Sequence, residues 1–566
     1  MPLGEKNIRR ITAGSLIVAT LATRLPLASK MLYEFDSIDF AVATFRYSLE
    51  QVTPHFPGYI LHILFAKFLL LFTSDVNQAF VWISMLLSIG SVLYLWRAAA
   101  ALRGERVGLI AAGIWLFLPI FWFHGLVSTV YEYEAFFACA FLYHGIKLFR
   151  SPKQQWHFFA LCIMLSLATG SRQSSLIFFS PAVLFIALIT RQQFKTLAAG
   201  FGLFILTTGT WLSILLVMCG GLRAYITAMQ SEHVYRSQSV LFGNELKEHL
   251  AVMAKVVVYL ISSGFSFVLV LLVALLLYPK RFLVFCKSLR RSRLLQYISL
   301  IALPPLIFYL AVYFMKGGYL LNVLPSGALA AAVLIDQIAI WRAENIKTRP
   351  GNALLLTRPL ITKTAMILTG SIILLEIAWF SIRLPFSTDE AYYYAFSTVT
   401  FDRGLNEATR ASTGMEYILT RILFFTSYYS IEESDRLHSS VRSTLETELS
   451  KHPNLVLLDN WWNRWAYYYL PTATIYDLLN NDKQGYLSVG KSNYFVREVV
   501  LNPVVDIPAN AEVLLLMRHD HPDFKHIADQ LQLERLPLPE YLDIWKVKTK
   551  GFTFVWLDKT FTQAPQ

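Results

Sequence analysis

The sequence predicts a polytopic α-helical membrane protein that ends in a water-soluble α/β domain. Its 566 residues are 55% hydrophobic and only 16% charged, whereas a soluble globular protein carries about 25% charged residues. Long apolar runs fill the chain as far as Phe380, and charged residues concentrate beyond it. Between these runs the basic residues form short clusters, which is typical of cytoplasmic membrane loops. The formal net charge of +12 therefore indicates a membrane protein and argues against a nucleic-acid partner.

The apolar runs predict the membrane topology. A spanning helix needs roughly 20 apolar residues, and the runs predict about 11 such helices. The expected spans are Ile11–Leu27, Gln78–Trp96, Gly108–Phe123, Ala135–Phe149, Trp156–Thr169, Leu176–Thr190, Thr196–Met218, Ala251–Tyr278, Tyr297–Phe314, Tyr319–Ile340 and Leu360–Phe380. Every second span ends at a Lys/Arg cluster, which places the N-terminus in the cytoplasm and the C-terminal part outside it.

Two domains follow from this topology: a transmembrane domain over residues 1–380 and an extracytoplasmic α/β domain over residues 381–566. The first extracytoplasmic loop covers about residues 28–77. Its apolar piece Pro57–Phe72 is interrupted by His62 and Lys67, so we expect a helix lying in the membrane interface. In the second domain the pattern predicts two helices and four strands: helices Glu432–Leu449 and Phe524–Leu531, and strands Leu455–Leu458, Glu512–Met517, Leu542–Val547 and Phe552–Leu557.

Two acidic residues in the first loop lie on a predicted amphipathic helix. From Phe35 to Arg46 the apolar residues follow a helical period, and Asp36 and Asp39 are three apart, so their side chains are neighbours beside the apolar stripe. Such a helix can lie on the membrane with its carboxylates at the surface. The alternative is that Asp36 and Asp39 only cap the start of the helix, and spacing alone does not separate the two.

Short motifs around this helix resemble a known superfamily. Thr23-Arg24-Leu25-Pro26, Tyr33-Glu34-Phe35-Asp36-Ser37 and Pro54-His55-Phe56-Pro57-Gly58-Tyr59 are similar to the first luminal loop of GT-C glycosyltransferases. That superfamily includes the protein O-mannosyltransferases and the bacterial aminoarabinose transferases of lipid A. The sequence departs from the family pattern, because the usual adjacent Asp-Glu pair is here Asp36-Ser37-Ile38-Asp39.

The resemblance implies an inverting hexosyl or pentosyl transferase of the bacterial inner membrane, and hence of the cell envelope. Its donor would be a sugar on a polyprenyl-phosphate lipid, and its acceptor a glycan, a lipid or a protein. Asp36 aligns best with the family's catalytic aspartate, with Asp39 as the second candidate, and Glu134 fits the acidic residue of the second luminal loop. No cofactor is indicated with certainty, and a divalent cation at Asp36, Asp39 and Glu134 stays an alternative.

A departing lipid phosphate needs cations or hydrogen-bond donors to stabilise its charge. Arg172 and Lys316 both lie on the outward side of the predicted membrane, where basic residues are unusual, and cations in such places are functional candidates. His55 and Tyr319 are further candidates for contact with the phosphate. Each cation has an alternative in snorkelling to lipid headgroups, and Glu134 has one as an interfacial anchor.

Other functions stay open at this point. A ligase or polymerase of lipid-linked glycans would depend on arginines more than on a loop aspartate. A non-catalytic membrane binding protein and a transporter are further alternatives, although no repeated halves are visible. The aromatic run Trp461–Trp465 could stack on sugars, but packing against the protein itself is the favoured interpretation.

Overall fold

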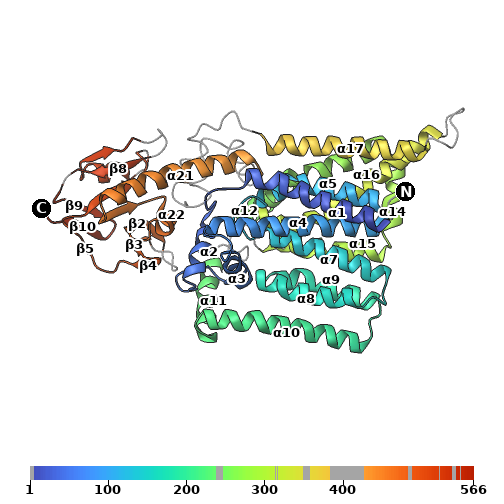
Figure 1. Cartoon of the computed structure of the whole chain (residues 1–566), viewed down its shortest axis with the longest axis horizontal. Coiled ribbons are helices and arrows are strands. Elements are labelled where there is room, and N and C mark those ends of the chain that lie inside the picture. The colour runs from blue at the N-terminus through green and yellow to red at the C-terminus, as the bar shows by residue number, and fades with distance from the viewer. Residues whose placement is uncertain are drawn as a thin grey trace.

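The computed structural model describes residues 5–237, 246–312, 314, 316–347, 357–382, 426–481, 487–519, 521, 523–537, 543–548 and 550–565. The chain forms a helical bundle followed by a domain with a β-sheet at one end of it (Figure 1). Most long helices of the bundle run along the same axis. The N-terminus lies at the end of the bundle that is far from the C-terminal domain.

Each predicted span coincides with a helix or a helix pair. The bundle helices are α1 (Glu5–Arg24), α4 (Val76–Arg103), α5 (Glu105–Phe117), α6 (Pro119–His124), α7 (Glu132–Arg150), α8 (Trp156–Ser171), α9 (Ser175–Ile189), α10 (Phe194–Met218), α12 (Leu246–Ser263), α13 (Phe265–Leu277), α14 (Pro279–Leu289), α15 (Arg293–Ala311), α16 (Leu324–Lys347) and α17 (Thr357–Phe380). Shorter elements are η1 (Leu25–Leu27), α2 (Phe35–Phe45), α3 (Ile60–Leu69), α11 (Leu222–Ser237) and η3 (Gly317–Asn322).

Among the described residues, five helices are long and apolar enough to cross a membrane, or six if the bent pair α12 and α13 forms one span. This composition confirms an integral membrane protein, whereas the count of about 11 spans stays a prediction. One boundary was wrong: the predicted span Tyr319–Ile340 begins as the 3-10 helix η3, and α16 starts only at Leu324. Helix α3 has 10 residues, too few to span a bilayer.

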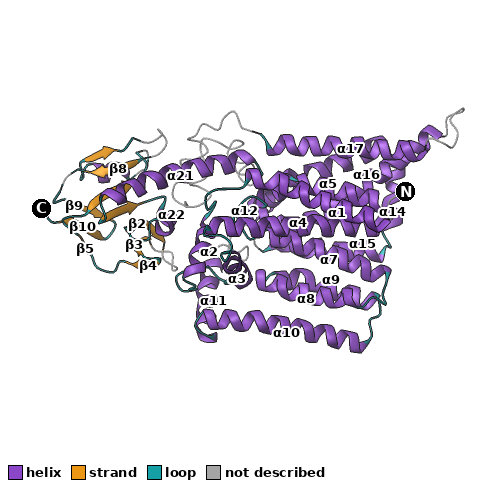
Figure 2. Ribbon diagram, viewed as in Figure 1, coloured by secondary structure: helices purple, strands orange, loops and turns teal. Residues whose placement is uncertain are grey.

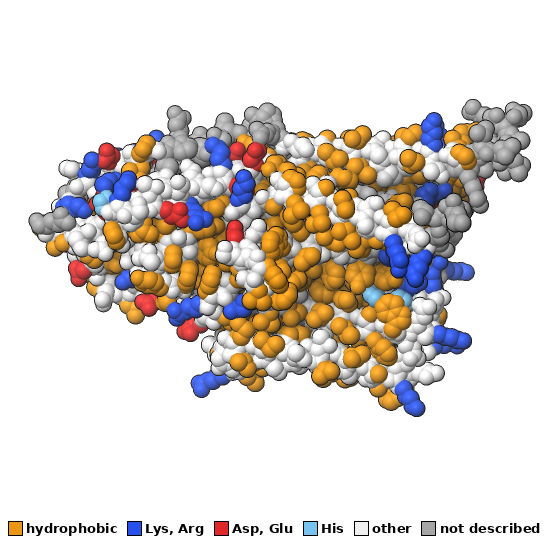
Figure 3. Space-filling view, in the orientation of Figure 1, with side chains coloured by type: hydrophobic (Ala, Val, Ile, Leu, Met, Phe, Trp, Pro, Cys, Tyr) orange, Lys and Arg blue, Asp and Glu red, His pale blue; other side chains and the backbone are white. Residues whose placement is uncertain are grey.

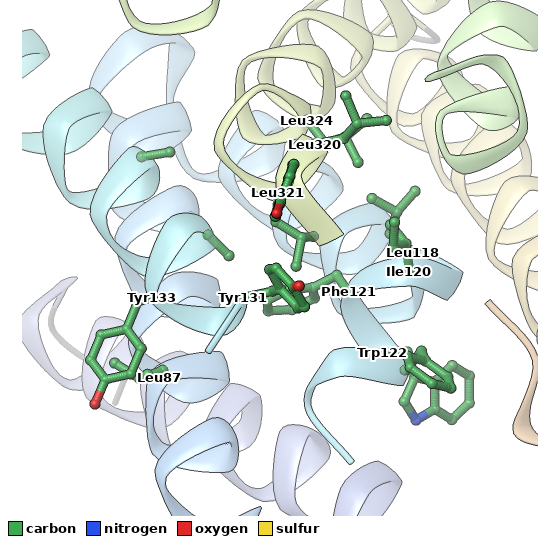
Figure 4. Close-up of a cluster of buried hydrophobic side chains, with 14 of the residues drawn as sticks. Leu87, Leu118, Ile120, Phe121, Trp122, Tyr131, Tyr133, Leu320, Leu321 and Leu324 are labelled. Carbon is green, nitrogen blue, oxygen red and sulfur yellow. The ribbon is translucent and has the colours of Figure 1, made fainter. Parts of the chain in front are cut away.

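Helix η3 enters the bundle because its side chains are apolar. Its residues Gly317 to Asn322 are all buried, and Leu320 and Leu321 lie beside Tyr131 at the start of α7 (Figure 4). Tyr131 also packs against Tyr319, with ring centroids 5.6 Å apart. This packing fixes the short segment that follows α15, and with it Lys316.

The surface of the bundle agrees with a membrane location. Hydrophobic side chains cover much of the visible face of the bundle, whereas Lys and Arg gather at the end away from the C-terminal domain (Figure 3). The C-terminal domain shows both acidic and basic side chains on the same view. The basic end is therefore the one that the sequence predicts to face the cytoplasm.

The C-terminal domain is an α/β structure, as predicted. Its helices are α21 (Tyr428–Lys451), α22 (Asn463–Tyr469) and α23 (Phe524–Ala528), and its strands are β1 (Leu455–Asp459), β2 (Thr474–Asn481), β3 (Leu487–Asn493), β4 (Val496–Val499), β5 (Val504–Ile507), β6 (Glu512–Leu516), β7 (Leu533–Arg535), β8 (Ile544–Val547), β9 (Thr553–Trp556) and β10 (Lys559–Gln563). The larger sheet has the order β4-β3-β2-β1-β6-β8-β7, and a small sheet has the order β5-β10-β9. The strands lie at the end of the molecule away from the helical bundle (Figure 2).

The centre of the larger sheet is parallel. Strand β1 pairs in parallel with β2, which places Asp459 opposite Asp477, and with β6 on its other side. All five residues of β1 and of β6 are buried, which explains their continuous apolar sequence. All predicted helices and strands of this domain were found, and six further strands were not predicted.

The C-terminal domain packs on the first loop of the bundle. Asp435 on α21 accepts hydrogen bonds from Ser29 Oγ (2.9 Å) and from the backbone N–H groups of Lys30 (2.8 Å) and Met31 (2.9 Å). Phe45 of α2 stacks on Phe495, with centroids 5.7 Å apart. Helix α2 therefore lies at the junction of the two parts.

Replacing Asp435 by Ala should loosen this contact. Loss of the shared acceptor costs on the order of 1–3 kcal/mol, so we expect amide exchange at Lys30 and Met31 to rise roughly 5- to 100-fold. Hydrogen-exchange mass spectrometry of the full chain measures this. The matched control is E446A on the same helix, whose carboxylate pairs with Arg442 at the surface. Equal exchange in D435A and E446A would contradict the prediction.

Candidate active site

The acidic helix of the first loop begins two residues earlier than a capping role for Asp36 would need. Helix α2 starts at Phe35, its N-cap is Glu34, and no side-chain capping hydrogen bond is formed there. Asp36 lies inside the first turn, where a carboxylate also interacts favourably with the helix dipole. The capping alternative for Asp36 and Asp39 was therefore wrong, and their side chains are engaged elsewhere.

Helix α2 is more deeply buried than an amphipathic surface helix. Eight of its eleven residues are buried, from Ser37 to Thr44, because the bundle covers one side and the C-terminal domain another. The expectation of a helix lying on the membrane was wrong for this reason. Phe45 at its end is 58% exposed although it belongs to the apolar stripe.

One lysine joins two carboxylates at the start of α2. Lys316 Nζ lies 2.8 Å from Glu34 Oε2 and 2.7 Å from Asp36 Oδ2. Burial alone would raise the pKa of Asp36, but the Lys316 ammonium and His55 hold this pKa below its ordinary value. Burial raises the pKa of Glu34. Asp36 is thus ionised, with its side chain still 29% exposed, whereas that of Glu34 is 5% exposed.

The second aspartate of α2 faces the other part of the protein. Asp39 forms an ion pair with Arg464 of α22, and its side chain is only 3% exposed. Burial raises the pKa of Asp39, against the opposing effects of Arg464 and Arg497. Arg464 was not predicted as a site residue, although it lies inside the aromatic run Trp461–Trp465. The only available signal was a single cation within that run.

His55 lies beside the acidic pair. Its Nδ1 is 4.0 Å from Asp36 Oδ1, and its Nε2 is 3.2 Å from Tyr59 Oη. Single ligand atoms from Asp36, Asp39 and His55 all lie within 4.8 Å of one another. Two carboxylates and an imidazole suit a divalent cation, but the ion would have to displace Lys316 and Arg464. Glu134 is not part of this group.

Glu134 instead belongs to a second polar cluster. Arg172, which follows the last residue of α8, donates to Glu134 Oε1 at 3.0 Å. Asn322 Nδ2 donates to Glu134 Oε2 (3.1 Å) and to Tyr309 Oη (2.7 Å). Glu134 is 3% exposed and Asn322 fully buried, while the Arg172 side chain is 18% exposed. Asn322 was not predicted as a site residue.

Tyr319 lies between the two clusters. The Arg172 guanidinium sits 4.0 Å from the centroid of its ring, and Tyr319 also interacts electrostatically with Lys316 and Asp36. The structure therefore brings all seven predicted site residues into adjoining positions. They are Asp36, Asp39, His55, Glu134, Arg172, Lys316 and Tyr319.

Gly58 explains one of the loop motifs. Its φ of +100° is in the left-handed region that favours glycine, and a Cβ there would collide with the Tyr47 hydroxyl. Tyr47 Oη donates to the Gly58 carbonyl at 2.8 Å. The turn places Tyr59 and His55 on the side of the acidic helix, where both rings pack on Phe40.

Comparisons with known proteins concern the fold and the family resemblance. Residues 54–218 match a family model described as dolichyl-phosphate-mannose-protein mannosyltransferase. The crystal structure of ArnT from Cupriavidus metallidurans bound to undecaprenyl phosphate aligns with a TM-score of 0.55 at 12% identity, over 97% of this chain and 99% of that chain. The apo structure of ArnT from the same organism gives a TM-score of 0.52 at 12% identity, with the same coverage. No curated protein matches the sequence.

These comparisons confirm two expectations. The likeness to ArnT extends over nearly the whole chain, including the C-terminal domain, and shows that the fold is of the GT-C type. The family match confirms the predicted resemblance to the protein O-mannosyltransferase group. At 12% identity the structural likeness concerns the fold and assigns no role to individual residues.

The Arg172–Glu134 pair generates a stability prediction. R172M leaves a buried carboxylate without its cation, which costs about 3–5 kcal/mol in comparable pairs. We expect a clearly lower melting temperature in detergent for R172M, and partial recovery in the double variant R172M/E134Q, which removes the unpaired charge. The control R442M breaks an exposed pair and should cost less than about 1 kcal/mol. A melting temperature of R172M equal to that of R442M would refute the prediction.

Proposed function

We propose that this GT-C-type membrane protein is a glycosyltransferase that moves a sugar from a polyprenyl-phosphate donor to an acceptor hydroxyl outside the cytoplasm. The observation that carries the proposal is the Lys316 ammonium held by Glu34 and by the partly exposed Asp36. In this pair the Lys316 ammonium can bind a phosphate group, and the Asp36 carboxylate can accept a proton. The two functions of such a reaction thus meet within one ion pair.

The donor phosphate has suitable partners among the described residues. Lys316 and Arg172 are the cations on either side of Tyr319, and both are partly exposed. His55 and the Tyr319 hydroxyl can add hydrogen bonds. That the ArnT structure of the same fold holds undecaprenyl phosphate supports a donor of this class for this chain.

Donor binding would activate the base. As long as Lys316 holds Asp36, the lowered pKa makes this carboxylate a weak proton acceptor. A donor phosphate competes for the same ammonium, and once Lys316 turns to the phosphate, the pKa of Asp36 rises. The base is thereby strengthened only when the donor is present.

The transfer is then a single displacement with inversion. Asp36 takes the proton of the acceptor hydroxyl. The acceptor oxygen forms the new bond to the anomeric carbon, and the bond from that carbon to the phosphate oxygen breaks. The electron pair leaves with the polyprenyl phosphate, whose added charge Lys316 and Arg172 stabilise. We propose a hexose or pentose as the sugar transferred.

Exposure favours Asp36 over Asp39 as the base. The Asp36 side chain is 29% exposed and that of Asp39 is 3% exposed, so an acceptor hydroxyl can reach the first but not the second. Glu134, equally buried, is better suited to hold Arg172 in place than to meet a substrate. We therefore assign Asp39 and Glu134 to the support of the charged groups.

The orientation follows from the charge distribution. Because Lys and Arg gather at the end away from the C-terminal domain (Figure 3), we propose a cytoplasmic N-terminus and an extracytoplasmic C-terminal domain in a bacterial inner membrane. The transmembrane domain would then cover residues 1–380 and the outer domain residues 381–566. The active site lies at the outer end of the bundle, in reach of a lipid donor.

D36N tests the base. Loss of a general base lowers turnover typically 10²- to 10⁴-fold, so transfer from a panel of radiolabelled undecaprenyl-phosphate sugars, in membranes, should nearly vanish. The control E50Q changes another carboxylate of the same loop and should keep turnover within about twofold. Full activity of D36N would exclude Asp36 as the base.

K316A tests the phosphate site without knowledge of the sugar. Loss of a charge-assisted hydrogen bond costs about 1.5–3 kcal/mol, so undecaprenyl phosphate should bind roughly 10- to 100-fold more weakly in native mass spectrometry or calorimetry. K67A removes an exposed lysine at the end of α3 and should bind like the unaltered protein. Unchanged binding by K316A, with an intact melting temperature, would contradict the assignment.

A further inference from the structure

We propose that the C-terminal domain completes the active site, with Arg464 acting as a positioning residue that fixes Asp39 and thereby helix α2 and its Asp36 carboxylate. The catalytic meaning of this inference rests on the proposed function above. The contacts that Arg464 makes are present in the structure whatever the function is. They join two residues that are 425 positions apart in the chain.

Arg464 contacts the N-terminal part of α2 at two points. Its guanidinium pairs with Asp39 and lies over the ring of Phe35, with Cζ 4.9 Å from the centroid. Phe35 directly precedes Asp36, and Asp39 follows it by three positions, so the two contacts lie on either side of Asp36 along the helix. A shift of Arg464 therefore moves the turn that carries the proposed base.

Arg464 is itself held by its own helix. The neighbouring Trp465 is 1% exposed, donates from Nε1 to the Leu32 carbonyl at 2.9 Å, and packs against Phe35 with centroids 5.1 Å apart. On its other side Trp465 stacks on His438 at 4.3 Å. Helix α22 is thus a rigid support for the guanidinium, between the first loop and α21.

A second arginine of the C-terminal domain strengthens the contact. The backbone N–H of Arg497 donates to Gln51 Oε1 at 3.0 Å, and its charge acts on Asp39 together with that of Arg464. Asp477 acts on both arginines from the domain side. Asp39 therefore faces Arg464 and Arg497 across the junction, and His55 and Asp36 within its own loop.

This arrangement differs from ordinary domain packing. The described residues of the junction also include neutral contacts, such as the Phe45–Phe495 stack. Arg464 instead pairs with the nearly buried carboxylate of Asp39. Asp39 lies about one helical turn from Asp36, the residue that we propose to accept the proton. A small displacement of a reacting group can lower turnover about 100-fold, so the position of this turn matters more than its stability.

The first measurement needs no substrate. In the full-length protein in nanodiscs, R464Q should raise amide exchange over residues 35–46 about tenfold and leave the helices of the bundle unchanged. The control R436Q removes an arginine of α21 that pairs with Glu433 at the surface and should exchange like the unaltered protein. Unchanged exchange over residues 35–46 in R464Q overturns the inference.

The second measurement uses the donor sugar that the unaltered protein accepts. R464Q should lower kcat about 10- to 100-fold and change KM for the donor by no more than about threefold. R464K should lower kcat less than R464Q does. The control R436Q should leave kcat unchanged. If Arg464 acts through Asp39, the double variant D39N/R464Q should be no slower than D39N alone. Multiplying losses, or equal losses in R464Q and R436Q, overturn the positioning role.

The two proposals fail in different ways. If the unaltered protein binds no undecaprenyl phosphate and transfers no sugar from the panel, the proposed function is wrong, and exchange over residues 35–46 still decides whether Arg464 holds α2. If D36N abolishes transfer while R464Q keeps full kcat and normal exchange, the function stands and the inference is wrong.

Discussion

The Lys316 ammonium is the charge on which the arrangement around the first loop depends. It lies between two carboxylates, one of them nearly buried, and two such groups side by side repel each other unless a cation shares them. The segment that carries Lys316 is held in turn by the packing of η3 in the bundle (Figure 4). Apolar packing of η3 thus positions Lys316, and the charge of Lys316 allows Glu34 and Asp36 to lie side by side in the folded protein.

The two polar clusters solve the same electrostatic problem in different ways. Around Glu134 the carboxylate is satisfied by one arginine and one amide, all within the bundle. Around Asp39 the counter-charge arrives from the C-terminal domain. A buried carboxylate is costly without its cation. The cluster around Glu134 therefore stabilises the bundle by itself, whereas Asp39 is neutralised only when the C-terminal domain is packed on the bundle.

Much of the fold could be predicted from local patterns in the sequence. Apolar length marked the spans, and the helical period from Phe35 to Phe45 marked α2. Strand β1 was visible because it is buried on both faces, whereas β2 and β3 are interrupted by Asn480, Asn481 and Gly490 and do not read as strands. The start of α16 was misplaced because the apolar residues of η3 are as hydrophobic as a membrane helix.

Candidate site residues could be predicted from the sequence when their own type and position pointed to a function. Residues that matter only through a partner distant in the sequence could not. Outward-facing cations drew attention to Arg172 and Lys316, but no local pattern shows that Lys316 meets Glu34 across 282 positions. Arg464 was missed for the same reason, since the rings around it dominate the pattern. Capping was a reasonable local interpretation of Asp36, and it was wrong by two residues because the helix begins at Phe35 and its N-cap is Glu34.

The contact between Asp39 and Arg464 also sets an order in time. The first loop is synthesised long before the residue that pairs with Asp39, since this partner follows 425 positions later. A newly made chain therefore carries Asp39 without Arg464 until the C-terminal domain has folded against the loop. Under the role proposed for Arg464, the site around α2 is complete only when the C-terminal domain is in place, so a chain that ends before α22 should be inactive.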